Sequence, residues 1–228
     1  MDPRNRLVYR LHDRALADAA GRYARGRLID IGCSDKPYAE MLAPLVDEHL
    51  GVDHEATLHA HARPDIVADA YHIPEPDDSF DTALCTSVLE HLEEPAKAIG
   101  ECFRLLRPGG HAIYSVPFIW HVHEQPRDFV RFSPFGLRHR FESAGFEVLE
   151  VQALSGFWVT FGTLLSYKLF ALKKGRRWLT WLPLMDAASW VVQRIAAVLE
   201  RLDRDERWSW MHLIVARKPQ RSAAAGGQ

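Results

Sequence analysis

Short apolar runs alternate with helical patterns along most of this chain. Seven runs are bounded by glycine, proline or acidic residues, as strands commonly are. They cover residues 27–31, 49–53, 65–68, 81–86, 111–116, 146–151 and 211–217. Strands that alternate with helices are typical of βα units in a mostly parallel sheet. The pattern therefore predicts an α/β fold with a doubly wound, seven-stranded sheet and helices on both faces.

Two of the predicted helices carry clear end signals. Apolar residues from Ala98 to Leu106 recur on one helical face, and Pro108-Gly109-Gly110 follows as a stop. A later helix begins with Ser133 as N-cap and Pro134 in the first turn, and ends at Gly145. A long helical, aromatic-rich segment, residues 157–207, then separates the sixth strand from the last. We interpret it as a hydrophobic insertion before the last strand.

The same pattern suggests how the chain divides. Residues 1–26 read as an N-terminal helical extension, and residues 27–218 as one domain that includes the insertion. Residues 219–228 are small and polar, which favours a disordered tail.

Composition and charge exclude several classes of protein. The 47% hydrophobic and 25% charged shares are ordinary for a globular protein. The net charge of -2 offers no cationic field for a nucleic acid, and the arginines near the amino end fit the solvated face of a leading helix. The scattered Cys33, Cys85 and Cys102 predict neither disulfides nor a zinc site. Because residues 1–10 also lack the apolar core of an export signal, we expect a cytoplasmic location.

A strand that runs into a glycine turn is the first candidate for chemistry. Residues 28–34 place Gly32 where a ligand can approach backbone N–H groups. The next strand ends at Asp53, where a carboxylate can accept hydrogen bonds from ribose hydroxyls. Asp69-Ala70 ends the third strand and would lie beside a nucleobase. For either aspartate alone, a cap on an ordinary turn is an equal alternative.

Five motifs in this order resemble those of class I S-adenosylmethionine-dependent methyltransferases of the type 11 kind. They are Asp30-Ile31-Gly32-Cys33, Gly51-Val52-Asp53, Ser79-Phe80-Asp81, Val88-Leu89-Glu90-His91-Leu92 and Leu106-Arg107-Pro108-Gly109-Gly110. The resemblance covers residues 28–151 and implies a Rossmann-like fold with S-adenosyl-L-methionine as cofactor. It also implies which residues contact the cofactor: Asp30, Gly32, Cys33, Ser34, Asp53, Asp69, Ala70, Thr86 and Ser87. Ser34 departs from the family, in which a second glycine is usual.

Titratable and aromatic groups gather after the fifth predicted strand, in residues 117–132. Their His-Glu-x-Pro-x-Asp-x-x-Arg pattern looks like that of a methyltransferase subgroup associated with surface-polysaccharide and glycolipid pathways. Histidine is the residue type that accepts protons near neutral pH. We expect His123, and second His121, to act as the base, with Glu124 or Asp128 orienting the imidazole and Arg131 binding an anionic acceptor. The alternative is that these residues only hold the loop in place.

The sequence predicts no metal site. His121-x-His123-Glu124 lacks the helical His-Glu-x-x-His spacing, and Pro126 interrupts any helix there. His59-x-His61 reads as a surface pair. For Glu90-His91, a cap or helix start is at least as good an interpretation as catalysis.

The motifs together predict a methyltransferase that moves a methyl group to a small-molecule, sugar or lipid-linked acceptor. One alternative is a methyltransferase-like module that only binds partners. A nicotinamide-dependent oxidoreductase is less favoured, because Gly32-Cys33-Ser34-Asp35-Lys36 does not supply Gly-x-Gly-x-x-Gly.

The insertion, residues 157–207, combines apolar and basic residues beside aromatic ones. Its basic and tryptophan residues include Lys173, Lys174, Arg176, Arg177, Trp178, Trp181 and Trp190. This mixture suits a lid over an apolar acceptor or peripheral contact with a membrane, and ordinary helix packing onto the domain or a homodimer interface are equal alternatives.

Overall fold

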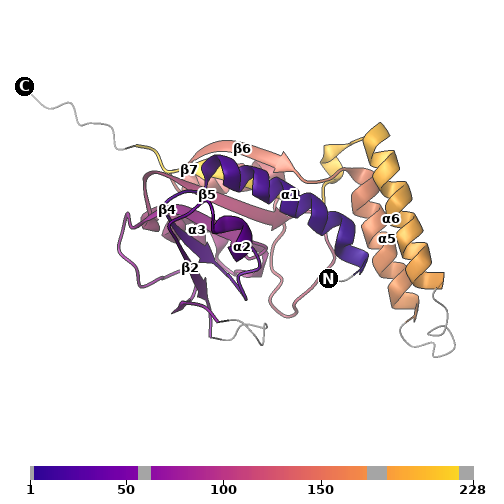
Figure 1. Ribbon diagram of the computed structural model, residues 1–228, viewed down its shortest axis with the longest axis horizontal. Coiled ribbons are helices and arrows are strands. Elements are labelled where there is room, and N and C mark those ends of the chain that lie inside the picture. The colour runs from indigo at the N-terminus through magenta and orange to yellow at the C-terminus, as the bar shows by residue number, and fades with distance from the viewer. Residues whose placement is uncertain (1–2, 56–62, 174–183, 221–228) are drawn as a thin grey trace, which may run out of the picture. The chain divides into compact units, whose positions relative to one another are not determined.

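A seven-stranded sheet forms the framework of the protein (Figure 1). The computed structural model describes residues 3–55, 63–173 and 184–220. The strands lie in the order β3-β2-β1-β4-β5-β7-β6. Their bounds are β1 (Arg27–Ile31), β2 (Glu48–Asp53), β3 (Ile66–Val67), β4 (Phe80–Thr86), β5 (Leu106–Pro117), β6 (Glu147–Ala153) and β7 (Met211–Arg217).

Parallel pairing brings the carboxyl ends of the first strands to one edge of the sheet. β1 pairs in parallel with β2 and β4, so that Ile31 lies opposite Val52 and Asp30 opposite Leu84. β7 is antiparallel to β5, because Lys218 donates a hydrogen bond to the Gly110 carbonyl while Phe118 donates to the Trp210 carbonyl. The mostly parallel α/β sheet that the sequence predicts is therefore confirmed.

Six helices accompany the strands in the described residues. They are α1 (Arg6–Tyr23), α2 (Ala39–Leu42), α3 (Pro95–Leu105), α4 (Pro134–Ser143), α5 (Phe157–Lys173) and α6 (Leu184–Leu202), with short 3-10 turns at Pro3–Asn5, Leu89–His91 and Glu206–Trp208. The predicted caps of α4 are confirmed: the Ser133 hydroxyl accepts a hydrogen bond from the Gly136 backbone N–H, and Pro134 occupies the first turn. The helical insertion before the last strand is confirmed as α5 and α6.

Two strands, β5 and β3, differ most in length from the sequence prediction. β5 begins at Leu106 rather than at residue 111, because the Pro108-Gly109-Gly110 stop forms an irregularity inside the strand, opposite β4 between Phe80 and Thr82. β3 is reduced to two residues. α2 is a single turn, Ala39–Leu42.

Alternate strand residues are buried on both faces of the sheet. Ile29 and Ile31 of β1 join a core with α3 and α4 residues such as Ile99 and Phe141. Leu28 precedes Ile29, so its side chain points to the opposite face of the sheet, where it is equally buried outside that core. Burial on both faces is typical of a parallel sheet that helices cover on both sides.

The chain divides into two compact units. The first comprises Met1–Leu16, Pro117–Val122 and Ala153–His212; the second comprises Ala17–Val116, His123–Gln152 and Leu213–Gln228. The N-terminal boundary at residue 26 and the disordered tail stay predictions. The tail from 221 on, His59, His61, Lys174, Arg176, Arg177, Trp178 and Trp181 lie outside the described residues.

Within the first unit, α5 and α6 lie side by side (Figure 1). The Glu200 carboxylate accepts hydrogen bonds from the backbone N–H groups of Gly156 and Val159, which satisfies the start of α5. A Cβ on Gly162 would lie 2.7 Å from the Cβ of Ala196, so the two helices approach closely at that glycine. Among the described residues, none of the helices has both the length and the apolar character required to cross a membrane.

Candidate functional site

The glycine turn after β1 has a backbone that only glycine accommodates at residue 32. Gly32 has φ +74°, and a Cβ there would lie 2.3 Å from Cγ2 of Val88. The N–H groups of Gly32 and Cys33 both donate to the Val52 carbonyl, at 2.8 and 3.0 Å. The turn is thus held against the end of β2, and it brings the Val88 loop beside Gly32.

Asp53 holds this turn from the neighbouring strand end. Its Oδ2 accepts a hydrogen bond from the Ser34 N–H at 2.9 Å, and its Oδ1 accepts one from the His54 N–H at 2.8 Å. The Asp53 side chain is buried. Since a carboxylate offers about four lone-pair sites, each oxygen keeps capacity for a further donor such as a ribose hydroxyl. The residue that sequence analysis assigns to the ribose therefore also anchors the turn.

Asp30 and Cys33 lie deeper and are not reactive groups. Burial raises the pKa of the Asp30 carboxyl, and the hydrogen bond with Nε2 of His49, at 3.0 Å, opposes that rise. Burial also raises the pKa of the Cys33 thiol to about 12, so it is a neutral packing group. Both residues shape the turn from behind.

The other expected cofactor contacts lie at the same strand ends. The Ala68 N–H donates to the Asp53 carbonyl, which places Asp69 and Ala70 just beyond the end of β2. Asp69 is exposed, and its Oδ1 accepts hydrogen bonds from the N–H groups of Tyr71 and His72. The turn cap that sequence analysis kept open for Asp69 is thus present in the structure. Thr86 ends β4, and the exposed Ser87 follows with φ 55°.

The titratable loop after β5 is organised by an ion pair. Arg131 binds Asp128 through two hydrogen bonds of 2.5 and 2.8 Å, and Asp128 also accepts one from the His123 backbone N–H at 2.9 Å. Chiefly because of the Arg131 hydrogen bonds, the pKa of the Asp128 carboxyl falls to about 2. Nδ1 of His123 lies 3.5 Å from Oδ2 of Asp128. Arg131 thus holds Asp128, and Asp128 holds both the loop and the imidazole.

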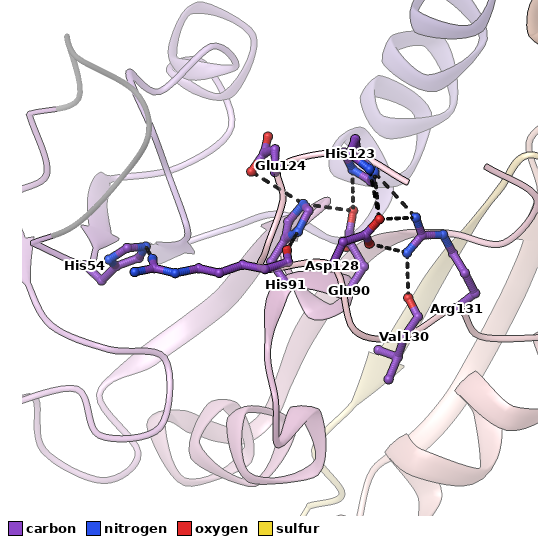
Figure 2. A network of polar contacts seen from close by, with 9 residues as sticks. His54, Glu90, His91, His123, Glu124, Asp128, Val130 and Arg131 are labelled. Carbon is purple, nitrogen blue, oxygen red and sulfur yellow. Dashed lines mark hydrogen bonds and ion pairs between the residues drawn. The ribbon is translucent and has the colours of Figure 1, made fainter. Parts of the chain in front are cut away.

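Glu90 lies at the centre of this cluster. Figure 2 shows its carboxyl group between the imidazoles of His91 and His123. Oε1 is 3.8 Å from Nε2 of His91 and 4.0 Å from Nε2 of His123. The side chain is fully buried, and within the described residues neither oxygen has a hydrogen-bond partner. Burial raises the pKa of the Glu90 carboxyl to about 8.

His91 links the cluster to the edge of the sheet where β2 and β4 end. Its Nδ1 donates to the Arg127 carbonyl, and its Nε2 lies 3.6 Å from Oε2 of Glu124. The Arg127 side chain donates a hydrogen bond to Nε2 of His54 at 3.0 Å, and His54 directly follows Asp53 in the sequence. The Phe129 N–H donates to the Glu90 carbonyl at 2.8 Å. The loop after β5 is therefore tied to both the β2 and β4 ends.

The two expected histidine bases have different environments. His123 belongs to the second unit and to the cluster around Glu90. His121 belongs to the first unit, where its ring centroid lies 4.5 Å from that of Tyr167 and 4.9 Å from that of Trp120. His121 is exposed. The base role of either residue stays a prediction, and the cluster geometry concerns His123.

Glu90 and His91 are not among the site residues predicted from the sequence. The signal that was present is a charged residue between two leucines, Leu89 and Leu92. A buried, unpaired carboxyl is a common mark of a functional site. Glu90 can be identified as a candidate site residue only once the fold is known, because the fold brings His123 near it from a distant part of the chain.

The described residues fit an S-adenosyl group. Asp53 retains acceptor capacity beside the Gly32 turn, and the carboxyl ends of β1, β2 and β4 meet at one edge. Ligands bind open α/β sheets at such edges. Gly32 and Ser34 would hold the methionine part, Asp53 the ribose, and Asp69 with Ala70 the adenine, as the family resemblance implies.

Comparison with known proteins agrees with this arrangement. Residues 29–114 match the family described as "Methyltransferase domain". A probable S-adenosylmethionine-dependent methyltransferase of Mycolicibacterium smegmatis is 30% identical over 154 residues, which are 61% of this chain and 59% of that protein. A ubiquinone biosynthesis O-methyltransferase of Alkalilimnicola ehrlichii is 36% identical over 111 residues, 44% of this chain and 45% of that protein. The chain thus spans about half the length of these relatives.

A solved structure extends the likeness beyond the matched segment. The crystal structure of the [4+2]-cyclase SpnF aligns with 90% of this chain and 81% of its own, with a TM-score of 0.60 and 22% identity. At that identity the likeness concerns the fold alone. The matched family and the relatives show that residues 29–114 form a methyltransferase domain of the S-adenosylmethionine-dependent kind, whose cofactor is S-adenosyl-L-methionine.

Proposed function

We propose that this protein catalyses methyl transfer from S-adenosylmethionine to a small-molecule, sugar or lipid-linked acceptor. The observation that carries the proposal is the buried Glu90 carboxyl facing His91 and His123, on a loop whose Val88 touches the glycine turn. A chain that only bound the cofactor would gain nothing from this arrangement, because a buried carboxyl without a hydrogen-bond partner is costly to maintain.

The reaction assigns separate tasks to the two groups of residues. The cofactor supplies an electrophilic methyl group on a sulfonium. Gly32, Ser34 and Asp53 bind and orient it, so that positioning provides much of the rate enhancement. An acceptor hydroxyl or amine must lose a proton during the transfer, and His123 is the proposed base, with Asp128 fixing its ring. Arg131 is engaged by Asp128 on two sides, which supports a positioning role more than direct binding of an acceptor anion.

An oxygen acceptor has the best support among the alternatives. One relative is named as an O-methyltransferase of ubiquinone biosynthesis. Incubation of the purified chain with S-adenosylmethionine and a series of phenols, catechols, sugars and glycolipids tests the proposal, with S-adenosylhomocysteine release and the product mass as readouts. Cofactor binding with a chemical change in the acceptor but no methyl gain would favour a different reaction on this fold, such as that of the cyclase.

We also propose that the helical insertion mediates association with a second copy of this chain. Four apolar residues on α6, Val191, Ile195, Val198 and Leu202, are exposed at alternating spacings of four and three. That spacing forms a continuous stripe on a helix and is typical of helix pairs between subunits. Contact with a membrane surface, or a lid over the acceptor, is the competing role for the same face.

A further inference from the structure

We propose that Glu90, His91 and His123 form a binding site for a divalent transition metal ion. The three residues come from two loops of the second unit, one after β4 and one after β5 (Figure 2). Each offers one ligand atom, and these atoms lie within 4.8 Å of one another. Two imidazoles and one carboxylate are a donor set that iron, cobalt and zinc ions accept.

The distances lie close to those of a formed site. Ligands about 2.1 Å from a tetrahedral ion are about 3.4 Å apart. The Glu90 oxygen is 3.8 and 4.0 Å from the two imidazole nitrogens. All three ligand atoms lie within 4.8 Å of one another, so the side chains need to close by at most about 1.4 Å around an ion, a movement within the reach of rotamer adjustment.

Both imidazoles have the orientation that ligation requires. A carbonyl oxygen only accepts, so the contact of His91 Nδ1 with the Arg127 carbonyl places the proton on Nδ1 and leaves the lone pair on Nε2. Nδ1 of His123 faces the Asp128 carboxylate, and its Nε2 faces Glu90. A metal-bound histidine commonly donates its other ring N–H to a carbonyl or a carboxylate. His91 makes the first kind of contact. Nδ1 of His123 lies 3.5 Å from the Asp128 carboxylate and 3.4 Å from the Arg131 guanidinium, so ligation through its Nε2 requires the Nδ1 proton to face Asp128.

The burial of Glu90 gives an independent reason for a cation. The carboxyl is fully buried with neither oxygen hydrogen-bonded among the described residues, yet it is aimed at two potential ligands. A buried carboxylate without a hydrogen-bond partner loses its hydration free energy, and a bound cation offsets that loss. A purely structural role would be served better by an apolar side chain at this position.

A fourth potential protein ligand lies beside the three. Oε2 of Glu124 lies 3.6 Å from Nε2 of His91 on an exposed side chain, so it can approach an ion as a fourth donor. Catalytic metal sites retain at least one position for water or substrate. A consequence that rests on the proposed methyl transfer is that the acceptor would bind the ion through a hydroxyl oxygen.

The chemistry at that hydroxyl balances without a further reactant. The O–H bond breaks and its proton passes to solvent, because a bound cation stabilises the resulting oxyanion. The oxygen then forms a bond to the methyl carbon while the carbon–sulfur bond of the sulfonium breaks, giving an ether and a neutral thioether. When the ion is bound, Nε2 of His123 is one of its ligands. The acceptor hydroxyl then loses its proton without His123 acting as the base.

Cobalt binding to the full chain tests the site directly. Tag-free protein, first treated with a chelator, is titrated with Co²⁺ by calorimetry, and its visible absorption is recorded, with Zn²⁺ and Mg²⁺ in parallel. The parent should bind Co²⁺ and Zn²⁺ more tightly than Mg²⁺, which prefers oxygen ligands. Glu90→Gln, His91→Ala and His123→Ala should each weaken Co²⁺ binding at least tenfold. The exposed Glu94→Gln and His139→Ala are matched controls that should bind like the parent.

Two results would overturn the proposal. One is a parent that binds no Co²⁺; the other is binding that persists unchanged in all three ligand variants, which would place the ion on other histidines. Since Glu90 is in the core, circular dichroism and S-adenosylhomocysteine binding verify folding, and the partly exposed His91 provides a variant with less risk of misfolding. Failure to bind S-adenosylhomocysteine while Co²⁺ binding persists would contradict the proposed function and leave the metal site standing.

Discussion

Oδ2 of Asp53 accepts a hydrogen bond from the Ser34 N–H at 2.9 Å, which joins the end of β2 to the glycine turn after β1. The carboxylate expected to bind the cofactor ribose is therefore also a structural part of the turn that receives the methionine portion. Changes at Asp53 should affect both parts of the cofactor, and this relationship guides the first prediction.

Asp53→Ala should weaken S-adenosylhomocysteine binding by about 1.5 to 3 kcal/mol, because a charge-assisted acceptor is lost. Calorimetry with purified protein measures the change, and NADH should not bind the parent. Asp47→Ala, an exposed aspartate just before β2, is the matched control and should leave affinity unchanged. Equal affinity of the Asp53→Ala protein and the parent would remove Asp53 from the ribose site.

Gly32→Ala should lower both stability and cofactor binding. The new Cβ would meet Val88 in a backbone conformation at φ +74°, and strain of this kind costs about 1 to 3 kcal/mol before any clash is added. Thermal unfolding and calorimetry provide the readouts. Gly100→Ala, inside α3 with open space around its Cβ position, should instead be neutral or stabilising by about 0.5 to 1 kcal/mol. A Gly32→Ala protein as stable as the parent would show that the turn adjusts.

His123→Ala should reduce turnover on a true acceptor about a hundredfold or more while S-adenosylhomocysteine affinity stays unchanged. The reason is that His123 lies in the Glu90 cluster and outside the glycine turn. Steady-state kinetics with detection of methylated product measures the loss, and the exposed His139→Ala is the control. Near-parental turnover would limit His123 to holding the loop.

Stability should fall in acid because of His111. Burial lowers the pKa of this imidazole to about 4, and Arg25 and Arg217 contribute in the same direction. The folded protein disfavours the charged imidazole. The free energy of unfolding is therefore highest above the ordinary histidine pKa of 6.5 and decreases as the pH falls toward 4. The loss amounts to about 1.4 kcal/mol for each pH unit in that window. Denaturant unfolding from pH 7.5 to 4.5 measures it.

His111→Phe is the variant that tests this assignment. It keeps an apolar ring of similar size and removes the titrating group, so its unfolding free energy should depend less on pH than that of the parent. His212, whose pKa burial also lowers to about 4, retains a similar contribution in the variant. An unchanged pH dependence would show that the acid sensitivity has another origin.

Ile195→Asp combined with Val198→Asp should convert a dimer to a monomer, because two charges would replace the middle of the exposed α6 stripe. Light scattering after size-exclusion chromatography measures the mass. Val67→Asp, at an exposed valine of β3, is the control. A monomeric parent that sediments with anionic vesicles, and less so in high salt, would instead indicate membrane contact.

Local signals in the sequence predicted the framework well. β1, β7 and the N-terminus of α4 follow from short-range rules: apolar runs and a Ser-Pro cap. The predicted start of β5 lies after the observed one, because Pro108-Gly109-Gly110 signals the end of a helix. The sequence alone does not show that β4 pairs with β5 both before and after these three residues. Strand pairing is a long-range property that these local rules do not include.

The site was predictable only where a family motif marks it. Gly32 and Asp53 follow a known order along the chain, and the structure brings them together. Glu90 also lies in a family motif, but the motif did not mark it as a site residue, because its importance comes from complete burial near two imidazoles. No metal site was predicted in this loop, because His121, His123 and Glu124 lack the spacing of a metal-binding motif. Spacing within one segment does not indicate ligands that another segment supplies.

Each of the two compact units is assembled from three separate stretches of chain, so neither exists as a continuous fragment. During synthesis, β5 and β6 leave the ribosome long before β7, the strand that pairs between them. A nascent chain therefore exposes two unpaired strand edges until its last strand emerges. Premature termination anywhere before β7 should give an aggregation-prone polypeptide rather than a smaller working enzyme.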